Sequence, residues 1–294
     1  MNGVLVIDKP AGPTSFDVVK RVRSLLKVKK AGHTGTLDPA ATGVLPICLE
    51  DATKVAGYIT LGDKAYDAVI RLGQTTDTQD AMGKVLSDRP VPNLTKALLE
   101  EAFAKFRGTF QQTPPMYSAV KVDGKRLYEL ARKGEEVERA ARTVTVHELT
   151  LRDFSSNELR LSVRCSKGFF VRTLAFELGE ALGCGAHLKA LRRTMSGPFS
   201  LSQAVALDKL ETLTTEEVSK RLVPVGEALS ELPSVSVNEA DGKKVVHGMP
   251  LEGFGEQLGR GKLRVLGHDG ALLAIGEVDA ASGRLKYLRV LVER

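Results

Sequence analysis

The sequence has few cysteines and none of the short motifs that hold metals or nucleotides. Its three cysteines, Cys48, Cys165 and Cys184, are far apart in a chain of 294 residues and form no Cys-x-x-Cys pair. This spacing predicts neither a zinc site nor a disulfide framework, so we expect three buried free thiols. Glycine-rich phosphate-binding motifs, nucleotide fingerprints and clusters of metal ligands are also missing. We therefore expect neither a metal nor a cofactor.

No segment is typical of a membrane span or of a targeting signal. Asp8 and Lys9 interrupt the apolar start of the chain too early for the core of a signal peptide, and no apolar run approaches the length that crosses a bilayer. The sequence also lacks internal repeats and low-complexity tracts. These observations predict a cytoplasmic protein without a membrane partner.

Apolar residues make up 43% of the chain, enough for a large core, and the formal net charge is +6. A charge excess of this size is common, so its distribution is more informative. Residues 20–30 hold six basic side chains and no acidic one. On a helix, Lys20, Arg23 and Lys27 would lie opposite an apolar face. Such a stripe is either a solvated surface or a contact for phosphates.

The apolar periodicity predicts an α+β chain. Strands are expected at 3–7, 44–49, 64–72, 117–122, 143–154 and 158–166, and helices from Thr14 or Ser15 to Leu26 and at 51–59, 94–106, 171–182 and 214–222. The composition changes near residue 230. Residues 231–294 then read as a small β module with strands at 262–266, 271–278 and 285–292. Its charges nearly cancel, so electrostatics alone does not support RNA binding by this module.

Residues 32–46 (GHTGTLDPAATGVLP) contain three glycines and two prolines, which predicts an ordered loop. Asp38 precedes Pro39, and this neighbour favours an extended backbone at the aspartate. For an isolated Asp-Pro pair, an Asx turn is the simpler interpretation. A catalytic carboxylate is the alternative, because ordered loops often present chemical groups.

Other candidate residues also have a structural alternative. Tyr66 lies on the core side of the strand at 64–72, where ordinary packing would explain it. Arg172 falls in the first turn of a helix, where the helix dipole disfavours a cation, so we expect either a specific carboxylate partner or a structural salt bridge. Arg192 and Arg193 are candidate phosphate contacts or the solvated end of a strand.

The string GHTGTLDPAATGVLPICL at 32–49, continuing into EDATK at 50–54, resembles the catalytic loop of the bacterial TruB-type tRNA pseudouridine(55) synthases. Further matches follow in the order of that family. They are VIDKP at 6–10, Tyr66, RLGQ at 71–74, TDT at 76–78, PPMYSA at 114–119, KRLYELARKG at 125–134, CSKG at 165–168 with Arg172-Thr173, GCGAHL at 183–188 and LRR at 191–193. The resemblance covers most of residues 1–230 and is weaker beyond them.

The resemblance implies a fold, a reaction and a partner. The fold would be a mixed, mostly antiparallel sheet flanked by helices and loops in a catalytic domain at 1–230, followed by a small PUA-like β domain at 231–294. The reaction would isomerise the uridine at position 55 of the tRNA T loop to pseudouridine, after base flipping and without a cofactor. The partner would be the T stem and loop of tRNA, and we infer a monomer with no obligatory protein partner.

The resemblance also assigns roles to individual residues. Asp38 would be the essential carboxylate, Arg172 would pair with it, and Tyr66 would stack on the uracil and help to remove its C5 proton. Leu191 would form an apolar wall against the base, and His33 would fill the space that the flipped nucleotide leaves.

Cationic residues would hold the RNA. Lys9 with Pro10 and the basic helix would grip the backbone of the stem and loop, and Arg192 and Arg193 are further candidates. The sequence departs from the family at Phe170, where many relatives carry a tyrosine, and a hydrogen bond from that position is therefore in doubt.

Two other classes of function remain open from the sequence. An RNA chaperone or binding module would not need a carboxylate facing phosphates, so an intact Asp38 and Arg172 disfavour it. A glycosidase that acts on nucleosides would normally use a pair of carboxylates, whereas the loop offers one.

Overall fold

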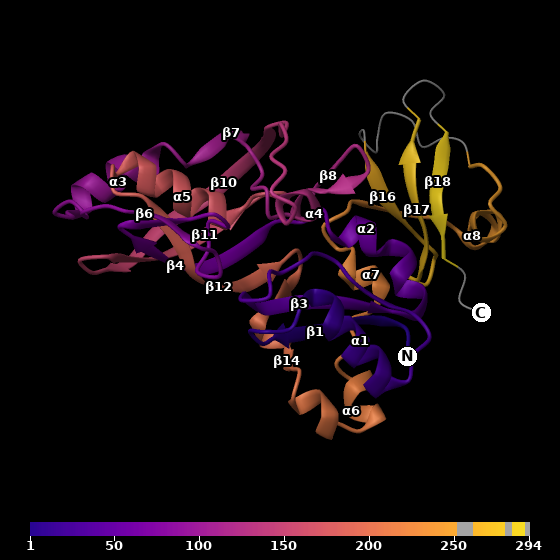
Figure 1. Ribbon diagram of the computed structural model, residues 1–294. Helices are drawn as coiled ribbons and strands as arrows, with labels where there is room; N and C mark the ends of the chain where they lie inside the picture. Colours follow the sequence, from indigo (N-terminus) through magenta and orange to yellow (C-terminus); the bar gives the residue numbers. More distant parts are fainter. Residues whose placement is uncertain (252–260, 280–283, 292–294) are drawn as a thin grey trace.

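A computed structural model describes residues 1–251, 261–279 and 284–291 of the chain (Figure 1). This part contains one large sheet of ten strands with the main order β14-β1-β3-β12-β4-β11-β10-β7, to which β2 adds beside β3 and β13 beside β12. Most neighbouring strands are antiparallel, while the β1–β14 and β3–β12 pairs are parallel. The predicted α+β fold with a mixed, mostly antiparallel sheet is confirmed.

The strands of the large sheet are β1 (Gly3–Lys9), β2 (Ala31–His33), β3 (Thr42–Leu49), β4 (Lys64–Leu72), β7 (Gly108–Gln112), β10 (Arg142–Phe154), β11 (Glu158–Cys165), β12 (Ala186–Ser196), β13 (Phe199–Ser200) and β14 (Val205–Ala206). Two hairpins lie outside it, β5 (Gln74–Thr76) with β6 (Val85–Asp88) and β8 (Lys121–Val122) with β9 (Lys125–Arg126). The α-helices are α1 (Ser15–Leu26), α2 (Ala56–Ile59), α3 (Lys96–Ala104), α4 (Leu127–Ala131), α5 (Val171–Ala181), α6 (Thr215–Ser219), α7 (Val225–Ala228) and α8 (Glu239–Val246). Short 3₁₀ turns are η1 (Glu50–Val55), η2 (Leu201–Gln203) and η3 (Lys209–Thr212).

Helix α1 begins at the predicted cap. The side chain of Thr14 accepts a hydrogen bond from the backbone N–H of Asp17, and the Asp17 carboxylate accepts one from the backbone of Thr14. This reciprocal capping box satisfies two donors that the first turn would otherwise leave free. Val18, Val19 and Val22 are buried in a cluster with β1 and β3. The apolar face therefore fixes α1 against the N-terminal half of the large sheet.

The loop that carries Asp38 is shorter than predicted, because strands enter it from both ends. β2 pairs with β3 from Ala31 to His33, and β3 already begins at Thr42. Gly43 adopts a φ of +102°, and a Cβ atom at this position would lie 2.1 Å from the carbonyl oxygen of Arg193 on the neighbouring strand β12. Only glycine permits this close approach. Strands β2 and β3 thus hold the two ends of the loop, and Gly43 lets β3 lie close against β12.

Two cores lie on the same face of the sheet. One contains α3, α5 and the strands β4, β10 and β11, and the other contains α1 with β1 and β3. The first is anchored by fully buried side chains such as Phe103 and Ile70, each of which stabilises the fold by about 1.5–3 kcal/mol. Tyr66 and Leu191 are partly buried against both cores. They therefore mark the place where the two cores meet.

The strand predicted at 117–122 is wrong in extent. Only residues 121–122 pair, with β9, and the preceding residues form a turn in which the N–H of Ser118 donates to the carbonyl oxygen of Met116. The Ser118 carbonyl in turn accepts from Tyr128 at the start of α4. Local turn bonds replace strand pairing here, and they orient the Tyr117 carbonyl toward the interior.

A second sheet forms the C-terminal part of the chain, in the order β15 (Ser234–Ser236), β16 (Lys262–Leu266), β17 (Leu272–Val278) and β18 (Leu285–Val290). The strands predicted near 262–266, 271–278 and 285–292 are confirmed, although residue 292 lies outside the described residues. Figure 1 shows this sheet beside α2 and α7. Ile275 packs in one cluster with Val4 and Val6 of β1. The small sheet is therefore attached to the large one through a shared core.

Within the described ranges, no helix is long and apolar enough to cross a membrane. Cys48, Cys165 and Cys184 are free and buried, as predicted. Burial raises the pKa of both Cys48 and Cys165 to about 12. A thiol with such a high pKa is a poor nucleophile at neutral pH.

Candidate active site

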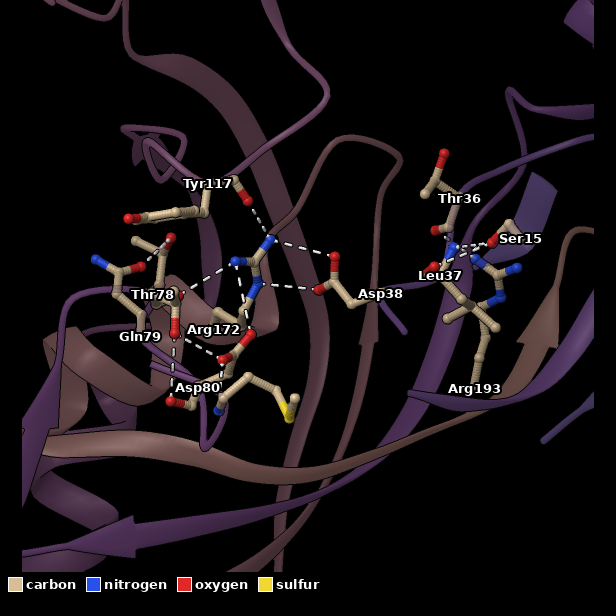
Figure 2. Close-up of polar contacts among 12 residues, drawn as sticks. Ser15, Thr36, Leu37, Asp38, Thr78, Gln79, Asp80, Tyr117, Arg172 and Arg193 are labelled. Carbon is tan, nitrogen blue, oxygen red and sulfur yellow. Dashed lines mark hydrogen bonds and ion pairs between the residues drawn. The ribbon is translucent and has the colours of Figure 1, made fainter. Parts of the chain in front are cut away.

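An aspartate from the central loop and an arginine from α5 form an ion pair (Figure 2). The Nε atom of Arg172 lies 3.0 Å from Oδ2 of Asp38, and its Nη2 donates to Oδ1 at 3.4 Å. The guanidinium therefore binds the carboxylate through two parallel contacts, the geometry that an arginine provides and a lysine does not. This is the carboxylate partner that the position of Arg172 in the first helical turn predicts.

The guanidinium of Arg172 is held on its other sides as well. Its Nη1 donates to the Thr78 carbonyl at 3.2 Å, and its Nη2 donates to the Tyr117 carbonyl at 2.8 Å. Only 6% of the Arg172 side chain is exposed. Because all these partners come from different segments, α5, the loop after β5 and the turn before β8 together fix where the guanidinium meets Asp38.

A second carboxylate, that of Asp80, lies on the far side of Arg172. Its Oδ2 is 3.8 Å from Nη1 of the arginine, while its Oδ1 accepts from the hydroxyl of Thr78 at 2.7 Å and from the N–H of Met82 at 3.0 Å. The matched TDT motif ends at Thr78, two residues before Asp80, and the sequence analysis therefore missed Asp80. A buried arginine generally needs more than one acceptor, and this requirement was the available signal.

The environment of Asp38 is protein on most sides and open on one, since 38% of its side chain remains exposed. Burial raises the pKa of Asp38, Arg172 lowers it, Asp80 raises it and Lys9 lowers it, with a net increase above the ordinary value. The arginine thus offsets the cost of burial only in part. A raised pKa brings the carboxylate closer to neutral pH, which suits proton transfer.

Tyr66 lies on β4 where the two cores meet. Its pairing partner across β4 and β12 is the buried Arg193. Burial raises the pKa of Tyr66, and Arg193 opposes this increase. Two positions along the same register, Ala68 pairs with Leu191, so Leu191 and Tyr66 share a face of the sheet.

Lys9 does not lie on the surface, and the prediction that it grips RNA is wrong. It is fully buried, and its Nζ donates to the carbonyl oxygens of Pro10, Pro39 and Ala41 at 2.9, 3.0 and 2.8 Å. Burial lowers the pKa of Lys9 to about 8, and the Asp38 charge opposes this decrease. An amine with three carbonyl partners fixes the shape of the loop around Asp38.

Arg193 is likewise buried, at 1% exposure, and the prediction that it contacts phosphate is wrong. Its Nε donates to the Val44 carbonyl at 2.7 Å, and its two Nη atoms donate to the Thr36 and Gly35 carbonyls at 3.4 and 3.1 Å. Arg193 and Lys9 therefore support the two ends of the Asp38 loop from β12 and β1.

Arg192 is partly exposed and forms an ion pair with Asp8. Its Nη2 lies 2.7 Å from Oδ2 of Asp8, and Nη1 donates to Oδ1 at 3.2 Å. A phosphate contact by Arg192 would compete with this pair. Lys20, Arg23 and Lys27 are exposed, and the basic stripe is thus on the surface as predicted.

His33 precedes the loop and is half-buried. Its Nδ1 accepts a hydrogen bond from the N–H of Gly35 at 3.3 Å. Burial lowers the pKa of His33, and the positive charge of Arg193 lowers it further. His33 is therefore neutral at neutral pH.

Phe170 is the N-cap residue of α5, two positions before Arg172. Its N–H donates to Oε1 of Gln112 at 2.8 Å, and Nε2 of Gln112 donates back to the Phe170 carbonyl at 3.2 Å. The start of α5 is thus fixed through the backbone of Phe170. This anchoring does not need the hydroxyl that a tyrosine would add.

Comparisons with known proteins show the family of the chain. The model of the TruB family pseudouridylate synthase N-terminal domain matches residues 23–171, and that of the tRNA pseudouridylate synthase B C-terminal domain matches 172–230. The chain is 46% identical to tRNA pseudouridine synthase B of Pseudomonas paraeruginosa (strain DSM 24068 / PA7) and 45% identical to that of Pseudomonas aeruginosa (strain UCBPP-PA14). Each comparison covers 99% of this chain and 96% of the relative.

Solved structures show the same architecture. The structure titled "Crystal Structure of a Cbf5-Nop10-Gar1 Complex" superposes with a TM-score of 0.77 at 27% identity, over 99% of this chain and 85% of that one. A structure of an H/ACA RNP bound to a substrate RNA containing 2'-deoxyuridine superposes with a TM-score of 0.75 at 25% identity, over 99% and 86%.

The sheet, its central loop and the family matches define the class: the protein is a pseudouridine synthase, an isomerase. Within this class, the chain belongs to the TruB family. The resemblance read from the loop motif is therefore confirmed.

Proposed function

We propose that the chain converts the uridine at position 55 in the T loop of tRNA to pseudouridine, with Asp38 as the essential carboxylate. The observation that carries this proposal is the Asp38–Arg172 pair, in which a buried arginine aims a carboxylate whose other side is open. The substrate class is taken from the relatives, which are named tRNA pseudouridine synthase B.

The reaction needs a carboxylate and no redox step. The N1–C1′ bond of the uridine breaks, the uracil turns, and a C5–C1′ bond forms, while C5 loses a proton and N1 gains one. An ionised Asp38 supplies either a nucleophile or a base for these steps. Arg172 keeps the carboxylate aimed while the bound uracil excludes water.

Tyr66 and Leu191 flank the proposed position of the uracil. Both lie between the two cores on one face of the sheet, where an aromatic ring and an aliphatic side chain would enclose a planar base. Because burial raises the pKa of Tyr66, its phenol stays protonated at neutral pH, which favours stacking over proton removal as its role. His33, neutral and next to the loop, would occupy the gap that the flipped uridine leaves.

The RNA would be recognised mainly by shape. The major groove of an A-form stem is too narrow for side chains to contact the base edges, so specificity depends on contacts with the folded loop and its backbone. Lys20, Arg23 and Lys27 offer exposed charge to that backbone. We further propose that residues 1–230 form the catalytic domain and 231–294 a PUA-like domain, that the enzyme acts as a monomer, and that it works in the cytoplasm, where tRNA is.

The direct test uses an unmodified tRNA transcript with tritium at C5 of its uridines. We expect release of tritium from one site and a nucleoside of unchanged mass at position 55. The Asp38→Asn variant should release none while its affinity for tRNA stays within about tenfold, because the amide keeps the shape but cannot act as nucleophile or base. Free uracil would indicate a nucleoside hydrolase instead, and tight binding without product would indicate a binding module.

A further inference from the structure

The surface stripe of α1 begins with an aromatic ring. Phe16 is 61% exposed, and Nζ of Lys20 lies 4.6 Å from the centre of its ring. A helix turns by about 100° per residue, so positions 16, 20 and 23 lie within an arc of about 60°. Lys27 is the C-cap residue of the helix. The stripe thus runs from one exposed ring to three cations.

Lys20, Arg23 and Lys27 form no ion pair among the described residues. Asp17, the closest acid in sequence, turns back and accepts bonds from the N–H and the hydroxyl of Thr14. The charge of the stripe is therefore available to an anionic partner.

The first turn of α1, which carries Phe16, is fixed next to the catalytic loop. Oγ of Ser15 donates to the Leu37 carbonyl at 3.0 Å and accepts from the Leu37 N–H at 2.8 Å. Ser15 directly precedes Phe16, and Leu37 directly precedes Asp38. Two hydrogen bonds between the residues that precede Phe16 and Asp38 thus hold the start of α1 against the loop.

We propose that Phe16 and Lys20 form a stacking site for an unpaired nucleobase of the RNA substrate, close to the nucleotide that Asp38 isomerises. This inference rests on the proposed function and adds a contact to it. Aromatic rings bind bases of any sequence by stacking, and a nearby cation strengthens the contact. Arg23 and Lys27 then follow the phosphates away from the loop. A protein partner would need an acidic surface around an apolar pocket, whereas single-stranded RNA supplies both charge and rings.

The test compares three variants for binding to an unmodified tRNA transcript over a series of salt concentrations. Phe16→Ala should weaken binding about tenfold at every salt concentration, because it removes stacking and no charge. Phe16→Tyr keeps the ring and should bind like the wild type. Leu86→Ala is the matched control, since Leu86 is 68% exposed on β6 and outside the stripe, and it should also bind like the wild type.

A photoreactive benzoylphenylalanine at position 16 would locate the contact. We expect a crosslink to an unpaired nucleotide of the T arm, and a crosslink only to paired stem nucleotides would overturn the proposal. Turnover by the wild type distinguishes a failure of the stacking site from a failure of the proposed function. If the wild type isomerises tRNA and Phe16→Ala binds normally, the stacking site is wrong and the proposed function stands. If Phe16→Ala weakens binding but the wild type forms no pseudouridine, the stacking site stands and the proposed function is wrong.

Discussion

The side-chain amine of Lys9 donates a hydrogen bond of 2.8 Å to the carbonyl oxygen of Ala41, three residues after Asp38. Its two further bonds reach Pro39 and Pro10. A single buried cation therefore connects the end of β1 to the segment that directly follows the catalytic aspartate. This connection makes the position of Asp38 dependent on a residue from a different strand.

Lys9→Met should reduce the free energy of unfolding by about 1–3 kcal/mol, because it leaves buried carbonyl oxygens without a donor. It should also reduce the single-turnover rate, since the loop loses its support. Urea unfolding and single-turnover kinetics measure the two effects. The salt dependence of tRNA binding should not change, in contrast to a Lys20→Met control. A weaker salt dependence of tRNA binding in Lys9→Met would indicate that Lys9 contacts the RNA.

The acid limb of the pH–rate profile should respond to Asp80. Activity requires the ionised form of Asp38, so it falls as the pH decreases through the pKa of this group. Burial and Asp80 both raise that pKa. Asp80→Asn removes one negative charge, so the acid limb should move to lower pH. The maximal rate should also fall, because Arg172 loses its ion pair with Asp80.

Single-turnover rates from pH 5 to 8 measure the shift, with Asp77→Asn as the control from the same loop. An acid limb that moves to higher pH would mean that Asp80 acts on Asp38 chiefly by holding Arg172 in place.

Arg172→Lys should lose most of the isomerisation rate despite keeping the positive charge. The guanidinium makes two contacts to Asp38 and donates to the carbonyls of Thr78 and Tyr117 at the same time, and an ammonium cannot reproduce this planar arrangement. Single-turnover kinetics at saturating tRNA provide the measurement, and circular dichroism checks the fold. A normal rate would reduce Arg172 to a structural role.

The sequence predicts those parts of the fold that depend on local pattern. Three elements appear as expected: the strand at 64–72, the capped helix after Thr14 and the helix from Val171. Burial of one face and backbone capping both depend on residues that are close together in the sequence. The strand expected at 117–122 fails because its alternation is overridden by turn bonds to Met116 and Tyr128.

The candidate site was predictable only where a motif or a local anomaly pointed to it. The first-turn position of Arg172 suggested a carboxylate, and the loop motif identified Asp38. Lys9 and Arg193 were misassigned because sequence shows that a residue is cationic but not that carbonyls from a distant loop bury it. Asp80 was missed for the same reason, since its contact with Arg172 depends on tertiary packing.

The enzyme should recognise the folded T arm of its RNA substrate. If it recognises the folded shape of the T arm, a minihelix with only the T stem and loop should be isomerised at the loop uridine at a rate close to that of full tRNA. An unfolded RNA of the same sequence should be a poor substrate, because the loop and its backbone no longer hold their arrangement. A minihelix with a changed stem sequence but intact pairing is the control, and it should react normally.

The C-terminal sheet should not be deleted in this comparison, since Ile275 packs against Val4 and Val6 of β1 and its loss would open the core beneath the site. A substitution on the outer surface of that sheet, Lys286→Glu, is the better probe. We expect it to raise KM for full tRNA more than it lowers the single-turnover rate, and to leave the minihelix reaction unchanged if this sheet contacts RNA beyond the T arm. Single-turnover rates and KM values for the four RNAs test both statements. Equal rates on folded and unfolded loops would refute recognition by shape.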